Sequence, residues 1–341
     1  MMKLFKNKKI LVTGGIGYIG KGLIKKLLEY KPDVIRVFDI NETGLFEFQQ
    51  ELKDYKNVRF LIGDVRDNER LKRAVDGVDI VFHLAALKHV ISSEYNPFEA
   101  VKTNVLGIQN LVEAALEKNV ERVILTSSDK AVNPSNTMGA TKLLGERLIT
   151  AANFYRGKSR TKFASIRFGN VIGSSGSIVP LFKKQIMEGG PVTITNTDMT
   201  RFVMPLKGAV ELILQCAKMA KGGEIFILKM PVIKIIDLAG AMAELLAPKY
   251  GYKKEDIKIK IIGMKPGETL YEELLNEHEA ESVIETEKMY IIPSSIEKYL
   301  IEKKDSYKKA RLCSKESYDS KNGNLLSKEE IKGLLAKEGL L

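Results

Sequence analysis

The chain has 341 residues, of which 44% are hydrophobic and 28% are charged, so it is long enough and apolar enough to fold around a core of its own. Its two cysteines, Cys216 and Cys313, exclude a disulfide framework and a cysteine zinc site, which fits a reducing cytoplasm. The formal net charge is +11, but the lysines are spread beside glutamates, so we expect a solvated basic surface and no nucleic-acid partner.

The first half of the chain alternates short apolar runs with helical periods, which is the pattern of a parallel sheet with crossover helices. Several runs are apolar almost throughout, as strands covered on both faces are. The expected strands are "KILVTGG", "VIRVFDI", "VRFLIGDV", "DIVFHLAA", "RVILTSS" and "FASIRFGNVIG". The expected helices cover about residues 17–30, 42–54, 68–75 and 98–118, and another begins near residue 136. We therefore predict an α/β fold with a doubly wound parallel sheet.

The later half is less regular. A Gly/Ser-rich loop at 173–177 precedes a Pro/Thr/Asp-rich stretch at 191–205, and then come a helix near 206–220, the strand "EIFILKM" and a helix near 236–246. We assign residues 1–172, with about 206–235, to a nucleotide-binding domain. Residues 173–205 and 236–341 form a smaller, discontinuous C-terminal lobe for the substrate, together with the tail.

The tail contains a charged region at about 302–321 and then "SKEEIKGLLAKEG". Ser327 and Glu330 have capping-box spacing, so we predict a final helix that docks through Ile331, Leu334 and Leu335. No apolar stretch approaches the roughly 20 residues that span a bilayer, and the start lacks the apolar region of a signal peptide, so we expect a soluble protein.

The stretch "ILVTGGIGYIGKGL" predicts a Rossmann dinucleotide site. Gly15, Gly17 and Gly20 have G-x-G-x-x-G spacing after a strand and at the start of a helix, where glycines let the backbone approach a pyrophosphate. Asp39 ends the second strand nineteen residues later, where its carboxylate can accept hydrogen bonds from both ribose hydroxyls. A carboxylate would repel a 2′-phosphate, so NAD is preferred to NADP.

Two other strand ends are candidates for cofactor contacts. Asp64 can meet the adenine amine, although a turn or helix-cap role is an equally good interpretation. The small residues of "HLAA", at 83–86, let a cofactor pass close to the backbone. His83 lies inside an apolar strand and is expected in the core. His83, His89 and His278 lack metal-ligand spacing, so we predict no catalytic metal.

Several motifs together resemble the extended short-chain dehydrogenase/reductase family over roughly residues 8–290. They are the glycine motif at 13–20, "GDVRD", "HLAA", "KTNVLGIQNL", "TSSDKAVNP" and "RFGNVIGSSGSIVPLF". Within that family, "SSDK", "NPSNTMGATK" and "GMKPGETLYEELL" are similar to nucleotide-sugar 4,6-dehydratases of the capsular polysaccharide biosynthesis type. Such enzymes serve surface glycan or nonulosonic acid synthesis.

The resemblance implies a cytoplasmic enzyme that holds NAD and converts UDP- or GDP-N-acetylglucosamine to a 4-keto-6-deoxy sugar. It also implies a homo-oligomer that associates through helices near 98–118 and 141–154. The implied cofactor-binding residues are Gly14, Gly17, Tyr18, Ile19, Asp39, Asp64, Val65, Leu84, Ala85, Ala86, Lys88, Asn104, Lys142 and Phe168. The implied substrate-binding residues are Lys88, His89, Asn170, Ser177, Val179, Arg201, Lys265 and Glu268.

Two of these substrate contacts have structural alternatives. Arg201 suits a diphosphate because its guanidinium can bond two oxygens, but an ordinary surface ion pair would also explain it. Asn170 ends the sixth strand and can bond a phosphate or an acetamido group, or it can cap a loop.

The implied reaction takes hydride from C4 to NAD, removes the C5 proton and the C6 hydroxyl, and returns the hydride to C6. By resemblance, Ser128, Asp129 and Lys130 are catalytic, with Asp129 as the acid for O6 and Lys130 as the base for C5. An adjacent carboxyl and amine can tune each other's pKa at one site. The structural alternative is a surface turn that carries a local Asp–Lys pair.

Met138 departs from the wider family, in which Tyr-x-x-x-Lys puts a phenol and an ammonium on one helix face. Met138 and Lys142 keep that spacing, but a thioether has no proton to exchange. Either the fold binds without reacting, or Lys130 or Asp129 takes the O4 proton. The second fits the resemblance, because dehydratases with Ser-Asp-Lys include members with methionine here. The rival functions are a nucleotide-sugar 4-epimerase and a non-catalytic NAD- or sugar-sensing module.

Overall fold

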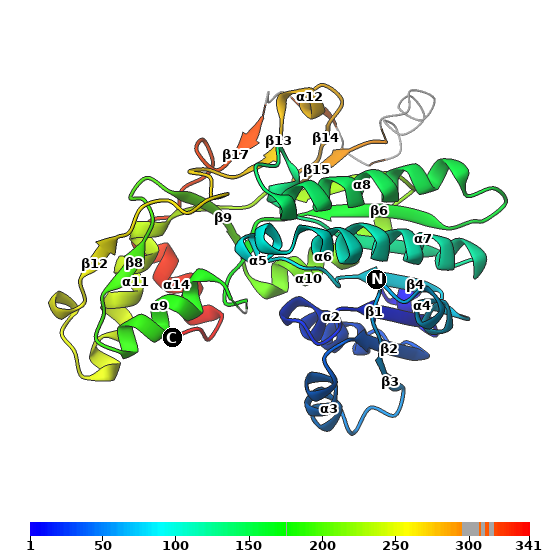
Figure 1. The fold of residues 1–341 in the computed structure, drawn as a ribbon, viewed down its shortest axis with the longest axis horizontal. Coiled ribbons are helices and arrows are strands. Elements are labelled where there is room, and N and C mark those ends of the chain that lie inside the picture. Colours follow the sequence, from blue (N-terminus) through cyan, green and yellow to red (C-terminus); the bar gives the residue numbers. More distant parts are fainter. Residues whose placement is uncertain (175, 295–306, 308–310, 314–316) are drawn as a thin grey trace.

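The computed structural model describes residues 1–174, 176–294, 307, 311–313 and 317–341. Much of the charged region that we predict at 302–321 lies outside these residues. Figure 1 shows a main body built on one large sheet, with helices on both of its faces, and a smaller lobe beside it that contains α9, α11 and α14.

The main sheet confirms the predicted fold class. Its parallel strands have the order β3-β2-β1-β4-β5-β6-β10. They are β1 (Lys9–Thr13), β2 (Val34–Asp39), β3 (Val58–Ile62), β4 (Ile80–His83), β5 (Arg122–Thr126), β6 (Lys162–Arg167) and β10 (Ile225–Leu228). The strand order reverses between β1 and β4, so a crevice for a ligand lies at the carboxyl ends of these two strands.

Helices cover both faces of this sheet. One face carries α2 (Tyr18–Leu28), α3 (Glu42–Glu51) and α10 (Leu206–Met219), and the other carries α4 (Asn68–Val75), α7 (Gly107–Glu117) and α8 (Thr137–Tyr155). The side chains of Asn41, Asp67 and Asn136 each accept a hydrogen bond from a backbone N–H of the first turn, which explains where α3, α4 and α8 begin.

The helix predicted at 98–118 is present, with a π turn inside it. Residues 97–117 run without interruption through α6 (Pro97–Val101), a π-helical turn (Lys102–Leu106) and α7, and a separate short helix, α5 (Val90–Tyr95), precedes them. Asn104, in the π turn, is buried, and its amide bonds the Leu87 N–H at 2.8 Å, the Leu87 carbonyl at 2.9 Å and the Thr141 hydroxyl at 3.0 Å. The turn thus aims Asn104 at a loop beside the crevice, as π turns at functional sites often do.

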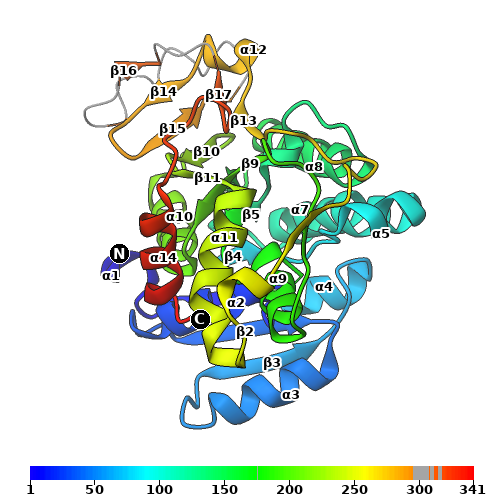
Figure 2. The same ribbon diagram turned by 90° about the vertical axis from the view of Figure 1, so that its left-hand side faces the viewer.

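Later segments contribute short strands and helices. The strands are β7 (Asn170–Val171), β8 (Val192–Ile194), β9 (Thr200–Met204), β11 (Val232–Lys234), β12 (Ile259–Ile261), β13 (Glu273–Leu275), β14 (Ile284–Glu285), β15 (Met289–Ile292), β16 (Arg311–Leu312) and β17 (Tyr318–Asp319). The helices are α9 (Ile178–Met187), α11 (Ile235–Leu246), α12 (Glu277–Ala280) and α14 (Lys328–Lys337), and a short α1 (Met2–Phe5) precedes β1. Figure 2 shows α11 and α14 side by side, with α9 close to them.

The smaller lobe has an apolar core of its own, drawn from α9, β8, α11 and α14. In contrast, β15 and β14, from the segment assigned by sequence to the smaller lobe, extend the main sheet in antiparallel fashion beyond β10. The domain boundaries given above therefore stay a prediction.

The final helix has the predicted cap and docking face. The Ser327 hydroxyl accepts from the Glu330 N–H, and the Glu330 carboxylate accepts in return from the Ser327 N–H. Ile331 and Leu335 are fully buried against α11, and Leu334 is partly buried there. In the described part of the chain, we find no helix that combines the length and the apolar character needed to cross a membrane.

Candidate active site

A cavity of about 560 Å³ lies at the carboxyl ends of β1 to β4. Gly14 has φ +66°, and a Cβ there would lie 2.6 Å from the Ala85 nitrogen, so this position requires glycine. Gly17 precedes the first turn of α2, whose free N–H groups and dipole favour an anion. These residues fit a dinucleotide pyrophosphate.

Two carboxylates line this cavity in different ways. Asp39 accepts hydrogen bonds from the Ile16 N–H at 3.2 Å and the Asn41 N–H at 3.1 Å, which hold the carboxylate at the end of β2. Asp64 bonds the N–H of Arg66 at 2.9 Å and its guanidinium Nε at 2.7 Å, so the turn role that we kept open is present. Burial raises the pKa of Asp64, but the bonds to Arg66 lower it by more.

The other predicted cofactor residues divide between this cavity, its neighbour and the core. Asn104 does not line the cavity, because its amide is used by Leu87 and Thr141; it instead shapes the loop that does. The cavity is lined by Tyr18, Ile19, Val65, Leu84, Ala85, Ala86 and Lys88. Lys142 and Phe168 line the adjoining cavity.

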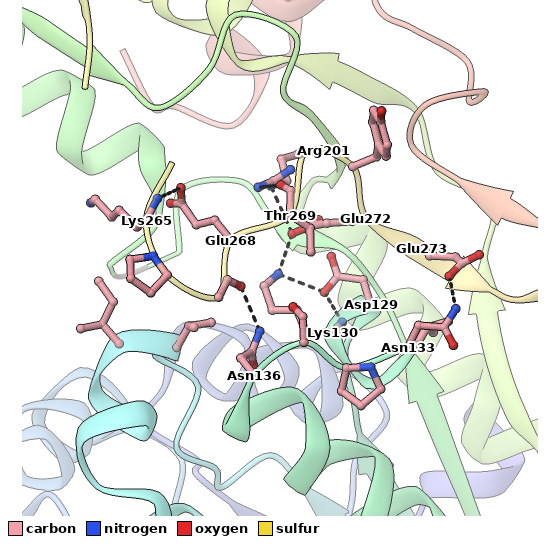
Figure 3. A pocket seen from close by; sticks show the side chains of 18 of the residues that line it. Asp129, Lys130, Asn133, Asn136, Arg201, Lys265, Glu268, Thr269, Glu272 and Glu273 are labelled. Atoms are coloured by element: carbon pink, nitrogen blue, oxygen red, sulfur yellow. Dashed lines mark hydrogen bonds and ion pairs between the residues drawn. The ribbon is translucent and has the colours of Figure 1, made fainter. Parts of the chain in front are cut away.

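That adjoining cavity, of about 260 Å³, brings the predicted catalytic residues together. Ser128, Asp129 and Lys130 follow β5, and Met138 and Lys142 lie on one face of α8. It shares Leu84, Ala86, Lys88, His89 and Ser174 with the cofactor cavity. It shares Asp129, Lys130, His89 and Asn170 with a larger cavity of about 620 Å³, which Figure 3 shows. A cofactor and a sugar can therefore meet at Asp129 and Lys130.

An ion cluster forms the wall between these cavities. The Lys130 ammonium lies 3.2 Å from the Asp129 carboxylate and 2.7 Å from that of Glu272. Arg201 Nε lies 3.2 Å from Glu272, and the Asn170 amide donates to it at 3.1 Å. Sequence reasoning missed Glu272, because it lies 142 residues from Lys130 and the only local signal is a pair of glutamates inside "LYEELL".

The cluster changes the protonation of its members. Burial and then the charge of Glu272 raise the pKa of Asp129 to about 7. Burial lowers the pKa of Lys130, but the charges of Asp129 and Glu272 raise it by more, so it stays an ammonium. Burial raises the pKa of Glu272, but the charges of Lys130 and Arg201 lower it by more, to about 2. The raised pKa of Asp129 suits the role of an acid. The raised pKa of Lys130 opposes the base role that resemblance implies for this residue.

Met138 and Lys142 are both buried beside this cluster. The Lys142 ammonium donates to the Thr126 carbonyl at 3.1 Å, and burial lowers its pKa to about 8. His83 is confirmed as a core residue: its ring lies 2.7 Å from the Thr13 hydroxyl, and burial lowers its pKa to about 3. In the ranges that the structure describes, no group of three His, Cys, Asp or Glu residues is arranged to hold a metal ion.

The predicted substrate residues farther out line a fourth cavity of about 300 Å³. The Arg201 guanidinium bonds carbonyls of Thr200 at 2.7 Å and Thr269 at 2.9 Å besides Glu272, so it is fixed rather than a loose surface charge. Glu268 accepts from the Lys265 N–H at 3.1 Å and closes the turn between them. The predicted residues that line this cavity are Asn170, Ser177, Val179, Arg201, Lys265 and Glu268.

A family model described as polysaccharide biosynthesis protein matches residues 10–294. The chain belongs to this family. A similar relative in Methanocaldococcus jannaschii, named as an uncharacterized membrane protein, is 56% identical over 97% of this chain and 96% of its own length. A UDP-N-acetylglucosamine 4,6-dehydratase (inverting) of Campylobacter jejuni is 45% identical over 86% of this chain and 85% of its own.

Other similar proteins include a UDP-glucose 4-epimerase of Rickettsia felis, 38% identical over 97% of this chain and 96% of its own length. The X-ray structure of Pen from Bacillus thuringiensis is 46% identical, covers 99% of both chains and superposes with a TM-score of 0.92. At 23% identity, the fold alone is shared with a dTDP-glucose 4,6-dehydratase of Streptomyces venezuelae solved with NAD and TYD (TM-score 0.68; 77% of this chain, 86% of that one).

Proposed function

We propose that this family member is an NAD-dependent UDP-N-acetylglucosamine 4,6-dehydratase, a hydro-lyase for surface glycan synthesis. One observation carries the proposal: a protonatable carboxyl, Asp129, and an ammonium, Lys130, share the wall of a cavity that opens onto the cofactor cavity. An elimination of water needs such an acid, whereas an oxidation at C4 alone does not. The 45% identical dehydratase supports UDP-N-acetylglucosamine as the sugar.

The cofactor cavity supports NAD. When bound there, NAD would supply the hydride chemistry of the reaction, from C4 of the sugar and back to C6. The residues that would hold it are Gly14 and Gly17 at the pyrophosphate, Asp39 at the adenosine ribose and Lys142 beside the nicotinamide ribose. The Asp39 carboxylate at the end of β2 disfavours NADP, because its negative charge would repel a 2′-phosphate.

Side chains of the cavity wall can serve the proton transfers of the reaction. O4 and C5 each release one proton, and the departing water and the final C5 each take one. Asp129 carries a proton near neutral pH and would give it to O6. By resemblance Lys130 takes the C5 proton, and for this its ammonium must first pass a proton to the neighbouring Asp129 or Glu272 carboxylate. The same lysine would return the proton to C5 after the hydride has reached C6. If Lys130 stays an ammonium, it would stabilise the negative charge on the sugar oxygen, and the C5 and O4 protons would go to solvent water in the cavity.

Met138 distinguishes this proposal from a 4-epimerase, the rival that the 38% identical relative raises. Both reactions move a proton at O4, which a thioether cannot do, but a 4-epimerase needs no acid and base for C5 and C6, whereas Asp129 and Lys130 can supply them. We propose that Met138 marks a dehydratase subclass in which this phenol is not used. The side chain is 3% exposed and would act by shape.

The chain should be incubated with NAD and UDP-N-acetylglucosamine and the product analysed by mass spectrometry and proton NMR. Loss of one water supports the dehydratase, and the C5 configuration reads out inversion or retention. An unchanged mass with a new C4 configuration would establish the epimerase, and unchanged sugar despite tight binding would establish a sensing module. GDP-N-acetylglucosamine in a parallel reaction tests the nucleotide.

We also propose that the protein works in the cytoplasm as a homo-oligomer. Its support is a set of exposed apolar side chains on α5, α6, the π turn and α8, namely Ile91, Tyr95, Phe98, Leu106 and Leu144. Light scattering during size-exclusion chromatography would measure the mass, and Phe98→Glu should reduce it if these helices form the interface.

A further inference from the structure

The Glu272 carboxylate lies at the centre of the ion cluster, and the roles proposed above give it no task. It is 5% exposed, and it bonds the Lys130 ammonium at 2.7 Å, Arg201 Nε at 3.2 Å and the Asn170 amide at 3.1 Å. Figure 3 shows that Lys130 and Arg201 reach it from different parts of the chain. One carboxylate thus fixes two cations at the wall of the cavity.

The backbone of Glu272 is itself held from two other segments. Its N–H donates to the Ser320 hydroxyl at 2.9 Å, and the Ser320 N–H donates to its carbonyl at 2.8 Å. The same hydroxyl lies 2.8 Å from that of Thr200, the neighbour of Arg201. Glu272 is therefore anchored at both its backbone and its carboxylate, which is the arrangement that an oriented site requires.

The position of Glu272 matters most for Asp129. A buried carboxylate is costly unless it is paired, and Glu272 has two cations whereas Asp129 shares only Lys130. Asp129 Oδ2 is buried and accepts no hydrogen bond from a donor in the described ranges, and the group that a proton on Asp129 can reach is the Glu272 carboxylate. Two carboxylates that share one ammonium do not both ionise easily, so the better-paired one keeps its charge and the other keeps a proton.

We propose that Glu272 is a positioning residue of the dehydration site, which holds Lys130 and Arg201 at the cavity wall and, by its own negative charge, keeps a proton on Asp129. The proposal rests on the dehydratase function, since it gives Asp129 its acid form for the departure of the C6 hydroxyl. It explains how an aspartate can act as an acid at neutral pH without a catalytic phenol nearby.

Other charged groups also face Asp129 or its cavities, and their contributions stay constant in the test. They are Lys88 and His89 before α5, Lys130 on its own turn, Lys142 on α8, Arg201 on β9, and Lys265, Glu268, Tyr271 and Glu273 in the segment that leads into β13. Glu277 is the matched control, because it is exposed on α12 and is not among the residues that line these cavities.

The experiment compares pH profiles of kcat for the wild type, Glu272→Gln, Glu272→Asp and Glu277→Gln. Gln keeps the size and one acceptor of Glu272 but removes its charge, so Asp129 should lose its proton at a lower pH. The alkaline limb should move down by about one pH unit, giving about tenfold less activity at pH 8 and less than about threefold change at pH 5.5. Glu272→Asp should restore the wild-type limb, and Glu277→Gln should keep it.

Two results would overturn the proposal. An alkaline limb that stays in place in Glu272→Gln would mean that its charge does not reach Asp129. An equal loss at every pH, not repaired by Glu272→Asp, would mean that Glu272 only maintains the fold.

A second measurement separates this proposal from the proposed function. Carboxyl ¹³C NMR of the whole chain, with the Asp129 signal identified by its loss in Asp129→Asn, follows the titration of Asp129 without substrate. Its midpoint should fall by about one unit in Glu272→Gln. A wild type that binds the sugar without turnover refutes the dehydratase alone, whereas an unmoved Asp129 midpoint refutes the role of Glu272 alone.

Discussion

Two buried ion clusters connect the main sheet to later segments, and they differ in what surrounds them. Around Arg167, Glu146 and Glu279 accept four hydrogen bonds from the guanidinium at 2.7 to 2.9 Å, and the Leu274 carbonyl accepts a fifth. Around Lys130, the cations face cavities, and one carboxylate oxygen of Asp129 has no partner in the described ranges. A closed cluster holds elements together, whereas an open one keeps charge available to a ligand.

The contrast between the two ion clusters is tested most directly by replacing Lys130. Lys130→Ala should abolish product formation, by at least about 10³-fold or roughly 4 kcal/mol in transition-state stabilisation, with little change in melting temperature. Rapid-quench measurement of sugar product checks this, and full turnover would refute a catalytic Lys130. Lys130→Arg then separates its two roles: partial activity indicates a fixed positive charge, and complete loss indicates a base.

The closed cluster should respond in the opposite way. Glu146→Gln removes one charge from a fully buried pair with Arg167, so unfolding free energy should fall by about 3 kcal/mol. Denaturant titration measures this change. The turnover of the remaining folded enzyme should stay near the wild-type value, and a selective loss of turnover without loss of stability would contradict the division between the two clusters.

Lys142 lines a cavity next to the open cluster, and burial of its ammonium should destabilise the fold. Its pKa in the folded state is about 8, below the ordinary 10.5 of a lysine, so the cost of burying its ammonium is absent above pH 10.5, grows as the pH falls from 10.5 to 8 and is complete below 8. Lys142→Met should therefore be more stable than the wild type by about 2 kcal/mol at pH 6.5, with a smaller gain at pH 9.5. Denaturation without cofactor at both pH values checks this; an equal gain at both would rule out the titration.

Met138 should have the smallest effect. Met138→Ala removes only apolar volume next to the cluster, so kcat should fall by less than about tenfold, and Met138→Leu should stay closer to the wild type. Steady-state kinetics with the proposed sugar measures both. A loss as large as that of Lys130→Ala would give the thioether a role beyond shape.

The same contrast explains which features could be predicted from sequence. The sheet, most of its helices and the glycine turn come from patterns contiguous in the chain, so periodicity and spacing predicted them. The π turn inside the helix at 98–118 brings Asn104 to Leu87 and Thr141, and no local pattern predicts these contacts.

The candidate site was predictable only in part, for a related reason. Asp129 and Lys130 are adjacent in the chain, whereas their partners Arg201 and Glu272 arrive from separate segments. The pKa direction of Lys130 follows from those distant carboxylates, so the base role that resemblance implies could not be tested against the sequence alone.

The hydrogen bond between Thr200 and Ser320 joins residues that are 120 positions apart, and it holds the segment that carries Glu272. During synthesis, therefore, the carboxylate at the centre of the open cluster can be anchored only after residue 320 has left the ribosome, when nearly all of the 341 residues have been made.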